Sequence, residues 1–492
     1  MADTLSVVRS FPPEKPKSFS PHDLDTQILA YLKRLDKLPG ATWTKTVDGK
    51  TFLEVLDPAV HSIAYLRTLN EQISQLKQQD RQRGELLFDQ ACIFFASFDP
   101  IQVRFVGELW RAVWEWAMHA SQSLGLVDVS VFSTALRRLD PSAATFTTLH
   151  LRFVRQCLGV GSPSQALAIL DRNIFAYPQA LPKSAHTEVL SEEHELSNAF
   201  ITTSSGFSEK ILPEHVLEYY LIGAHVYIGM RNFQRARLFL EHVILYPTLQ
   251  HVASTLQMEA YKKWILVGLL SEGKLFQQPR TVDQAVWKIL KAAGRAYEAL
   301  ADNFERRDWL KYQAELDVGS QIWIDDGNMG LVTEAGNALV KYRVSDLQKT
   351  YAALNVDRVA AHLGLDATAT LDILSRMIGG AQLNASLAPG STPGEAILRF
   401  NTASSAGATP QQSDLASQTK RIELLVAAVR DADCRLQLTK EHVAITKRNK
   451  NTAAPDAELA DQMDLSWDMP GSGSNVPQLL GDNSEDDEDI MV

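Results

Sequence analysis

Apolar residues recur at three- and four-residue intervals along most of the chain, whereas strict alternation is nearly absent before residue 380. This period places apolar side chains on one face of a helix, so the pattern indicates a mainly α-helical protein. Glycine, proline and Asp-Pro pairs separate the helices. Helices are predicted from Asp23 to the Pro39-Gly40 stop, over 50–80, 84–97, 101–123 and 127–138, as a hairpin over 253–275, and over 283–316.

Two segments, 150–178 and 220–247, share one pattern of a helix, a short turn, a second helix and a proline. Ala166 and Ala236 stand at corresponding places, separated by about two tetratricopeptide units of roughly 34 residues each. Small residues let paired helices approach closely, and proline ends a helix. The pattern predicts a helical-repeat solenoid that is tetratricopeptide-like, with unrelated helical hairpins as the alternative. Residues 183–212 are expected to form an insertion loop.

After the repeats, the pattern changes to short helices with their own start and stop signals. A capping-box sequence at Ser345 predicts a first helix whose apolar face runs to Leu354. Asn355 is expected to cap a second helix that ends at Gly364. A third helix is expected to stop at Gly379.

The period then changes from 3.6 residues to two, which is typical of half-buried strands. Leu383 and Leu387 lie on one face of a first strand, and a turn rich in proline and glycine follows over 389–394. A second strand places Leu398 and Phe400 on one side. Three helices followed by a two-stranded wing predict a winged helix.

A long terminal helix is expected after a linker rich in serine, threonine, alanine and glycine. Its apolar residues repeat every seven positions, and such a stripe requires partner helices to cover it. Packing against the chain's own domain is an equally good interpretation of the periodicity. The stripe comprises Leu415, Ile422, Val429, Leu436 and Val443 at the seven-residue spacing, with Leu425 at a second seam position beside them.

These patterns divide the chain into five parts. The first and the last are expected to be disordered, because their composition cannot build a core. The parts are an N-terminal segment 1–20, a helical-repeat arm 21–342, a winged helix 343–401, a bundle helix 412–447 and an acidic tail 448–492.

The net charge of −11 is concentrated in the tail, where residues 451–492 carry eleven acids and no lysine or arginine. The remaining 48 acids balance the 48 bases, so the preceding body has no general attraction for nucleic acid. Asp366 and Asp372 outnumber Arg376 on the third winged-helix helix, which argues against DNA binding. Ser484 precedes a run of acids and is a candidate phosphorylation site for an acidophilic kinase.

The sequence offers no catalytic, cofactor-binding or metal-binding constellation. Cys92, Cys157 and Cys434 lie far apart, and no histidines have the spacing of zinc ligands. The phosphate-loop spacing over 268–274 is followed by Leu275, where a magnesium-binding serine or threonine is needed. We therefore expect a non-enzymatic protein without cofactors. The absence of a secretory signal and of a membrane-length apolar run predicts an intracellular protein without a membrane partner.

The order of helical repeats, winged helix and terminal bundle helix resembles the PCI-domain families of the proteasome lid, the COP9 signalosome and translation initiation factors. Local sequences make the resemblance more specific and point to the third-subunit family of the signalosome, in a fungal-type form with an extended acidic tail. The resemblance is carried by 218–224, 229–236, 259–267 and 326–332.

This resemblance implies a non-catalytic scaffold subunit of a complex that removes Nedd8 from cullins and regulates cullin–RING ubiquitin ligases in cytoplasm and nucleus. The metalloprotease site of that complex belongs to another subunit. The implied contacts to neighbouring subunits are the winged-helix edge and a shared helical bundle. A subunit of a sister complex and a stand-alone helical adaptor remain alternatives. On this chain the contacts map to Leu383, Leu387, Leu398 and Phe400, and to the seven-residue stripe.

Overall fold

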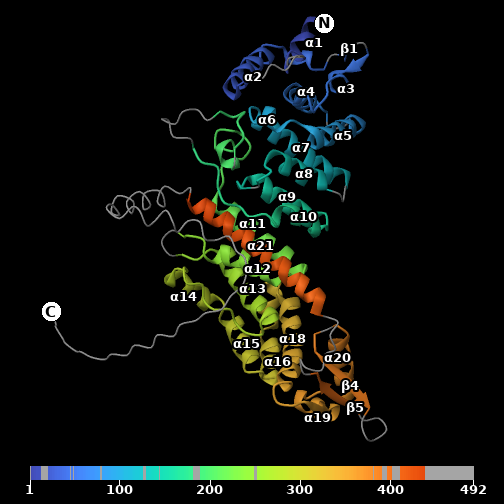
Figure 1. Cartoon of the computed structure of the whole chain (residues 1–492), viewed down its shortest axis with the longest axis vertical. Coiled ribbons are helices and arrows are strands. Elements are labelled where there is room, and N and C mark those ends of the chain that lie inside the picture. Colours follow the sequence, from blue (N-terminus) through green and yellow to red (C-terminus); the bar gives the residue numbers. More distant parts are fainter. Residues whose placement is uncertain are drawn as a thin grey trace, which may run out of the picture. The chain divides into compact units, whose positions relative to one another are not determined.

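The structure, a computed structural model, divides the chain into two units, Met1–Phe400 and Asn401–Val492. Figure 1 shows the helices and strands in the colours of the sequence. Helices dominate the described residues, as the apolar periodicity predicts. The described residues are 2–12, 20–44, 46–47, 49–77, 80–125, 129–142, 144–180, 189–194, 196–248, 252–380, 382–389, 396–401 and 411–437.

The first unit begins with short helices that pack on one another in succession. Proline at the first helical position and acidic caps begin several of them, because these residues satisfy or remove free backbone N–H groups. The elements are α1 (Ala2–Val8), α2 (Pro21–Leu35), η1 (Gly40–Thr42), β1 (Thr46–Val47), β2 (Lys50–Thr51), α3 (Phe52–Val55), α4 (Ser62–Ser74), α5 (Arg81–Ser97), α6 (Pro100–Val103), α7 (Gly107–Leu124) and α8 (Ser130–Leu139).

The N-terminal segment differs from the expectation of disorder over 1–20. Helix α1 packs against α2, and the Tyr31 hydroxyl donates a hydrogen bond to the Val8 carbonyl at 2.6 Å. The Phe11 ring lies 5.5 Å from the ring of Tyr31, and Val8 and Phe11 are both buried. The expectation of disorder is wrong for residues 2–12, because their few apolar side chains pack against α2 and are buried there.

Helical hairpins follow, and their positions confirm the two predicted repeat segments. The small residues Ala166 and Ala236 are fully buried at the helix contacts, as the packing argument requires. The elements are α9 (Thr148–Gly159), α10 (Pro163–Leu170), η2 (Ser197–Ala199), α11 (Pro213–Gly229), α12 (Phe233–Ile244), α13 (Thr255–Ser271), α14 (Gln284–Ala293), α15 (Arg295–Glu305), α16 (Trp309–Val318), α17 (Ser320–Asp325) and α18 (Met329–Leu347).

One turn recurs at the corners between paired helices. A residue in the left-handed region, with φ between 59° and 74°, is followed by a polar residue. The N–H of that polar residue donates to a carbonyl five residues earlier, at 2.8 to 3.1 Å. The left-handed residues are Gly161, Arg231, Arg307 and Gly327.

The predicted hairpin over 253–275 is wrong, because this segment forms the single helix α13. Its fully apolar stretch reflects burial on most sides, since α13 contacts α12, α15 and α18. Gly268 does not break the helix but allows the backbone after α13 to approach closely. A Cβ atom on Gly268 would lie only 3.0 Å from the carbonyl oxygen of Lys274.

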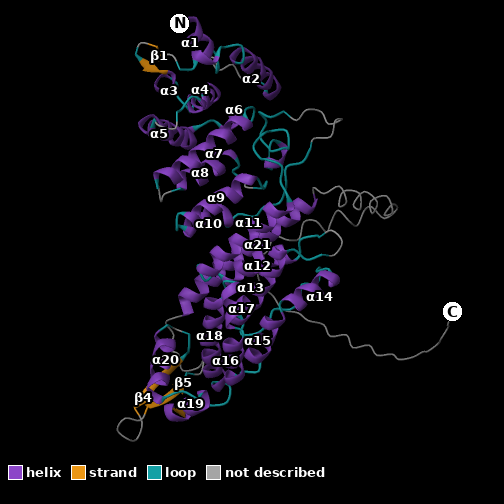
Figure 2. Ribbon diagram, turned by 180° about the vertical axis from the view of Figure 1, so that it is seen from behind, coloured by secondary structure: helices purple, strands orange, loops and turns teal. Residues whose placement is uncertain are grey.

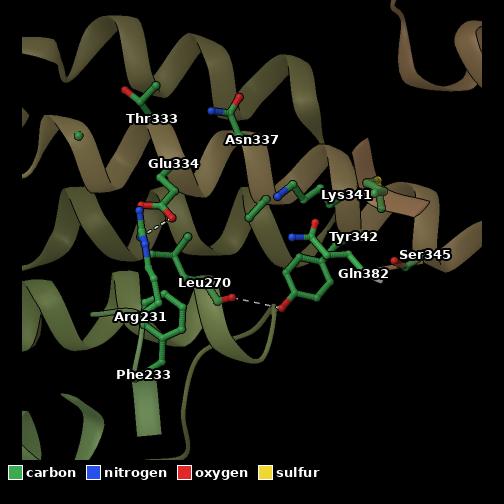
Figure 3. A pocket seen from close by; sticks show the side chains of 13 residues that line it. Arg231, Phe233, Leu270, Thr333, Glu334, Asn337, Lys341, Tyr342, Ser345 and Gln382 are labelled. Carbon is green, nitrogen blue, oxygen red and sulfur yellow. Dashed lines mark hydrogen bonds and ion pairs between the residues drawn. The ribbon is translucent and has the colours of Figure 1, made fainter. Parts of the chain in front are cut away.

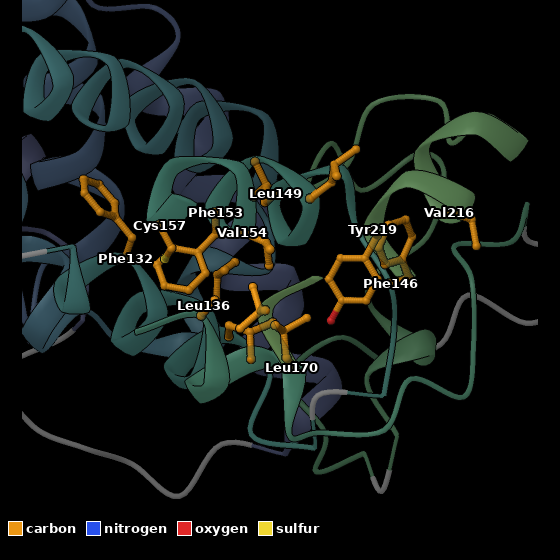
Figure 4. Packing of buried hydrophobic residues seen from close by; sticks show 14 of the residues in the cluster. Phe132, Leu136, Phe146, Leu149, Phe153, Val154, Cys157, Leu170, Val216 and Tyr219 are labelled. Carbon is orange, nitrogen blue, oxygen red and sulfur yellow. The ribbon is translucent and has the colours of Figure 1, made fainter. Parts of the chain in front are cut away.

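Apolar side chains of successive helices form one continuous core through the repeats. Tyr219 of α11 meets Phe146 at a ring separation of 5.1 Å, which joins neighbouring layers. Cys157 is fully buried here as a small apolar residue, as expected. Figure 4 shows this packing around Phe132, Leu136, Phe146, Leu149, Phe153, Val154, Cys157, Leu170, Val216 and Tyr219.

The described part of the expected insertion loop contains only the short helix η2, yet it contributes to the core. Phe207 is fully buried and lies 5.9 Å from the Trp110 ring of α7. Gly107 and Gly206 allow the close approach, since a Cβ atom on Gly206 would meet the backbone N of Glu108 at 2.7 Å. The loop therefore packs on α7 as part of the folded body.

A winged helix completes the first unit, with a separate hydrophobic core that begins at Val340 of α18. A three-stranded antiparallel sheet in the order β3-β5-β4 supports its helices, and its strands are orange in Figure 2. The elements are β3 (Ala353–Asn355), α19 (Val356–Leu363), α20 (Ala367–Gly379), β4 (Ala385–Pro389) and β5 (Ala396–Phe400).

Two of the predicted winged-helix helices are confirmed at their ends. Asn355 caps α19 by accepting from the Asp357 N–H at 3.1 Å, and Gly364 ends it with φ of 73°. The third helix ends at Gly379, as predicted. The prediction of a first helix that starts at Ser345 is wrong, because Ser345 lies inside α18 and Leu354 belongs to strand β3.

The second unit contains α21 (Gln411–Gln437), which corresponds to the predicted terminal helix. Every described side chain from Thr419 to Leu436 is exposed. A seven-residue apolar stripe needs a covering surface, and both partner helices and the chain's own first unit remain predictions for that surface.

Candidate partner-binding surfaces

The described residues contain no group of histidine, cysteine, aspartate or glutamate side chains that could hold a metal ion. Burial raises the pKa of Cys157 to about 12 and that of Cys92 to about 11, so both thiols are protonated at neutral pH. Neither Cys92 nor Cys157 is therefore a candidate for a reactive thiolate. Among the described helices, none is long and apolar enough to cross a membrane.

The phosphate-loop spacing at 268–274 does not form an anion cradle. Gly273 follows the end of α13 with φ of 71°, and a Cβ atom there would touch the Tyr342 ring at 2.8 Å. The Gly273 carbonyl accepts a hydrogen bond from Arg307 at 3.0 Å. This backbone is therefore used in packing.

Most of the residues predicted to form a partner interface on the winged-helix sheet are buried in the structure. Leu383, Leu398 and Phe400 are at most 7% exposed and belong to the core of the winged helix. A buried side chain cannot contact a partner without opening the domain, so the prediction is wrong for these three residues. Leu387 is partly exposed and still fits the predicted role.

The backbone at the rim of the sheet offers a different kind of contact. Strand β5 lies in the centre, so β3 and β4 each have one edge without a strand partner in the described part of the chain. Unpaired N–H and C=O groups on such an edge can accept a further strand. Pro389 ends β4 and limits that edge to a short segment.

Helix α20 does not have the charge of a DNA-reading helix. The Arg376 side chain donates to the Asp372 carbonyl at 3.2 Å within the same helix. Asp366 caps the start of the helix, where Thr368 donates to its carboxylate and lowers its pKa. The N-terminal end of α20 therefore presents an anion rather than a base.

Helix α21 presents a continuous apolar surface. The described stripe residues Ile422, Leu425, Val429 and Leu436 are between 55% and 60% exposed. Leu424 at 65% and Val426 at 44% widen this surface beyond the predicted stripe. Nothing is described of the Leu415 side chain, and Val443 and Ser484 lie outside the described residues.

A groove follows α18, and the sequence analysis did not predict it (Figure 3). Its volume is about 920 Å³. Its walls come from segments far apart in sequence, so no local pattern could have indicated it. The lining residues are Arg231, Phe233, Leu270, Gly330, Thr333, Glu334, Asn337, Ala338, Lys341, Tyr342, Ser345, Met377 and Gln382.

Polar contacts fix two parts of the groove. Arg231, at the corner between α11 and α12, forms an ion pair with Glu334 of α18. The Tyr342 hydroxyl donates to the Leu270 carbonyl at 3.5 Å, and burial raises the pKa of this phenol. Both contacts link α18 to the preceding repeats.

Helical hairpins that run through a shared helix into a winged helix define the class of PCI-type subunits of multiprotein complexes. A family model described as COP9 signalosome complex subunit 3, N-terminal helical repeats, matches residues 41–286. The chain belongs to the COP9 signalosome complex subunit 3 family.

Two relatives that carry the name COP9 signalosome complex subunit 3 match almost the whole chain. The protein from Emericella nidulans is 31% identical over 505 residues, which cover 98% of this chain and 100% of the relative. The protein from Neurospora crassa is 25% identical over 504 residues, covering 99% of this chain and 98% of the relative. The similarity therefore includes the winged helix and the terminal helix as well as the repeats.

Proposed function

We propose that the chain is a scaffold subunit of the COP9 signalosome and has no catalytic role of its own. The observation that carries this proposal is the exposed apolar stripe on α21, together with a relative named as subunit 3 that matches 98% of the chain. The stripe needs partner helices, and the subunits of a multiprotein complex supply them.

In this role the chain holds neighbouring subunits through the edge of the winged-helix sheet and through α21. Leu387 and the backbone of β4 are the proposed contacts on the sheet. Other subunits carry out the removal of Nedd8 from cullins, and cullin–RING ligases meet this chain only through the complex. Such a protein works in the cytoplasm and the nucleus.

The test replaces Val429 and Leu436 together by aspartate in the endogenous protein, followed by affinity purification and identification of the co-purifying subunits. We expect the double variant to leave the complex, because two charges on the stripe cannot be buried between helices. The control is Ala427→Asp with Arg430→Asp, which also puts two carboxylates on α21 but on another side of the helix. Complete co-purification of the stripe variant would refute the role of α21.

A subunit of the proteasome lid or of an initiation factor complex is the alternative that the sequence left open, and the comparisons do not favour it. The same purification separates the two, since a metalloprotease subunit with cullins identifies the signalosome, whereas proteasome or ribosome components identify a sister complex. The full-length match to subunit 3 relatives favours the signalosome.

A further inference from the structure

The groove along α18 leaves one face of this helix uncovered. Val332, Ala335 and Leu339 are buried on the opposite face, where α18 packs against α13 and α16. In the groove, Thr333 and Asn337 are exposed one helical turn apart. A helix in the middle of a packed unit normally has neighbours on both sides, so this face has room for a further element.

The floor of the groove is apolar although it is open. Phe233, Leu270, Ala338 and Tyr342 are half-buried, and Met377 is buried beside them. These side chains come from four different helices of the first unit, α12, α13, α18 and α20. Covering them would remove apolar surface from water and is therefore favourable.

The length of the groove matches a helix. Its lining on α18 runs from Gly330 to Ser345, which corresponds to about 22 Å or four turns. Gly330 keeps one end open, since a Cβ atom there would meet nothing within 4 Å. Helices pack at interaxial distances of about 8–10 Å, which small side chains such as Ala338 permit.

The charges of the groove indicate what a bound helix carries. Arg231 is already paired with Glu334, so these two charges compensate each other. Lys341 is exposed between them and the winged helix, and no carboxylate in the described part of the chain pairs with it. The groove therefore has one uncompensated positive charge beside its apolar floor.

We propose that this groove binds an amphipathic helix of another subunit, with apolar residues on one face and a carboxylate opposite Lys341. The inference rests on the proposed function, because the partner is a subunit of the same complex. The groove is lined by residues from both the repeat core and the winged-helix core, so a bound helix holds the winged helix against the repeats.

The test places the photocrosslinking amino acid p-benzoylphenylalanine at Asn337 in the full chain, within the purified complex. We expect one dominant adduct, mapped by mass spectrometry to an apolar and acidic helical segment of another subunit. The same amino acid at Lys311, exposed on α16, serves as the control and should not give that adduct. An adduct only within this chain, or no adduct, would overturn the proposal.

Charge and shape variants in the same complex make the test specific. Lys341→Glu should lower the yield of the Asn337 adduct about fivefold, whereas Lys341→Arg should retain it. Ala338→Glu should abolish the adduct by placing a charge on the apolar floor, with thermal unfolding of the chain as the check on folding. Equal yields in all variants would contradict the proposed chemistry.

The two proposals can fail separately. If the chain carrying the photocrosslinker co-purifies with the complex but gives no adduct to another subunit, only the groove proposal is wrong. If the unmodified chain does not co-purify with signalosome subunits at all, the proposed function itself is wrong.

Discussion

Arg307 has a left-handed backbone, with φ of 59°, and its Nε donates to the Asp346 carboxylate at 3.0 Å. Partial burial alone would raise the pKa of Asp346, but hydrogen bonds from Lys349 and Arg307 lower this pKa below its usual value. The same guanidinium donates to the Gly273 carbonyl and lies 5.1 Å from the centre of the Tyr342 ring. One strained residue thus joins a repeat corner to the helix that enters the winged helix.

Replacing this arginine by glycine should destabilise the protein. Arg307→Gly removes the backbone strain of about 1–2 kcal/mol, but it loses hydrogen bonds to Asp346 and Gly273 and the contact with Tyr342. We expect a net loss of about 1 kcal/mol, measured as a lower midpoint of thermal unfolding.

Arg231→Gly is the matched control, because it removes the same strain with little else. Its ion pair with Glu334 is largely exposed, and such pairs contribute less than about 1 kcal/mol. The midpoint should stay constant or rise. A fall as large as that of Arg307→Gly would show that the contacts of Arg307 are unimportant.

The close contact between α11 and α12 should not tolerate a larger residue at Gly223. A Cβ atom there would lie 2.6 Å from the Phe239 ring and 3.0 Å from Leu170. Gly223→Val should therefore cost about 2–3 kcal/mol in unfolding free energy through overpacking. The loss would be visible as a lower midpoint in denaturant.

Gly229→Ala provides the comparison, since it changes a glycine of the same helix that faces open space. Alanine favours helix over glycine by about 1 kcal/mol, so this variant should be neutral or stabilising. Similar losses in both variants would contradict the packing argument at Gly223.

Glu259 should make the stability of the repeats depend on pH below about 4.5. The His225 imidazole at 3.5 Å and the Lys263 ammonium at 2.8 Å lower the pKa of this carboxyl to about 2. Because the folded pKa is depressed, the stabilisation is present above the unfolded value of about 4.3 and is lost as the pH falls towards 2.

The measurement compares unfolding midpoints of the wild type and Glu259→Gln between pH 7 and pH 2.5. The variant should be less stable at neutral pH, and the difference should shrink with acidification. A difference that stays constant with pH would rule out this carboxylate as the source.

The Asp326 carboxylate is the centre of a partly buried hydrogen-bond network, and its removal should destabilise the protein. Lys262 donates to both carboxylate oxygens at 2.7 and 2.8 Å, and the Tyr297 hydroxyl donates at 2.8 Å. Asn328, fully buried, donates to that hydroxyl at 2.9 Å. Asp326→Ala should cost about 2 kcal/mol, because a cation and a phenol then lack their acceptor.

Thermal unfolding of Asp326→Ala beside Glu334→Ala checks this prediction. Glu334 belongs to a single ion pair whose arginine is 57% exposed, so its loss should change stability by less than about 1 kcal/mol. If the two variants unfold at the same temperature, the network does not contribute as described.

Signals that act within a few residues were sufficient to predict several elements. The ends of α19 follow from Asn355 and Gly364 alone, because capping depends on the nearest backbone groups. The same kind of signal was misleading at Ser345. Val340 and Val344 extend the buried face of α18 into the winged-helix core, and this tertiary packing outweighs a local capping box.

Features that depend on distant residues could not be predicted. Strand β3 is three residues long and exists through its pairing with β5, which no local period indicates. The left-handed corner at Arg307 falls inside the helical stretch predicted over 283–316, because arginine gives no local signal for that conformation. The groove along α18 requires the folded positions of several helices, whereas the α21 stripe was visible because it lies within one helix.

The central place of β5 in the winged-helix sheet has a consequence for synthesis on the ribosome. Both β3 and β4 pair with β5, which is the last of the three to be made. Until residues 396–400 leave the exit tunnel, neither earlier strand has a partner, although the complete repeats can already fold. A ribosome that pauses before this point would hold a chain with a finished arm and an unformed sheet.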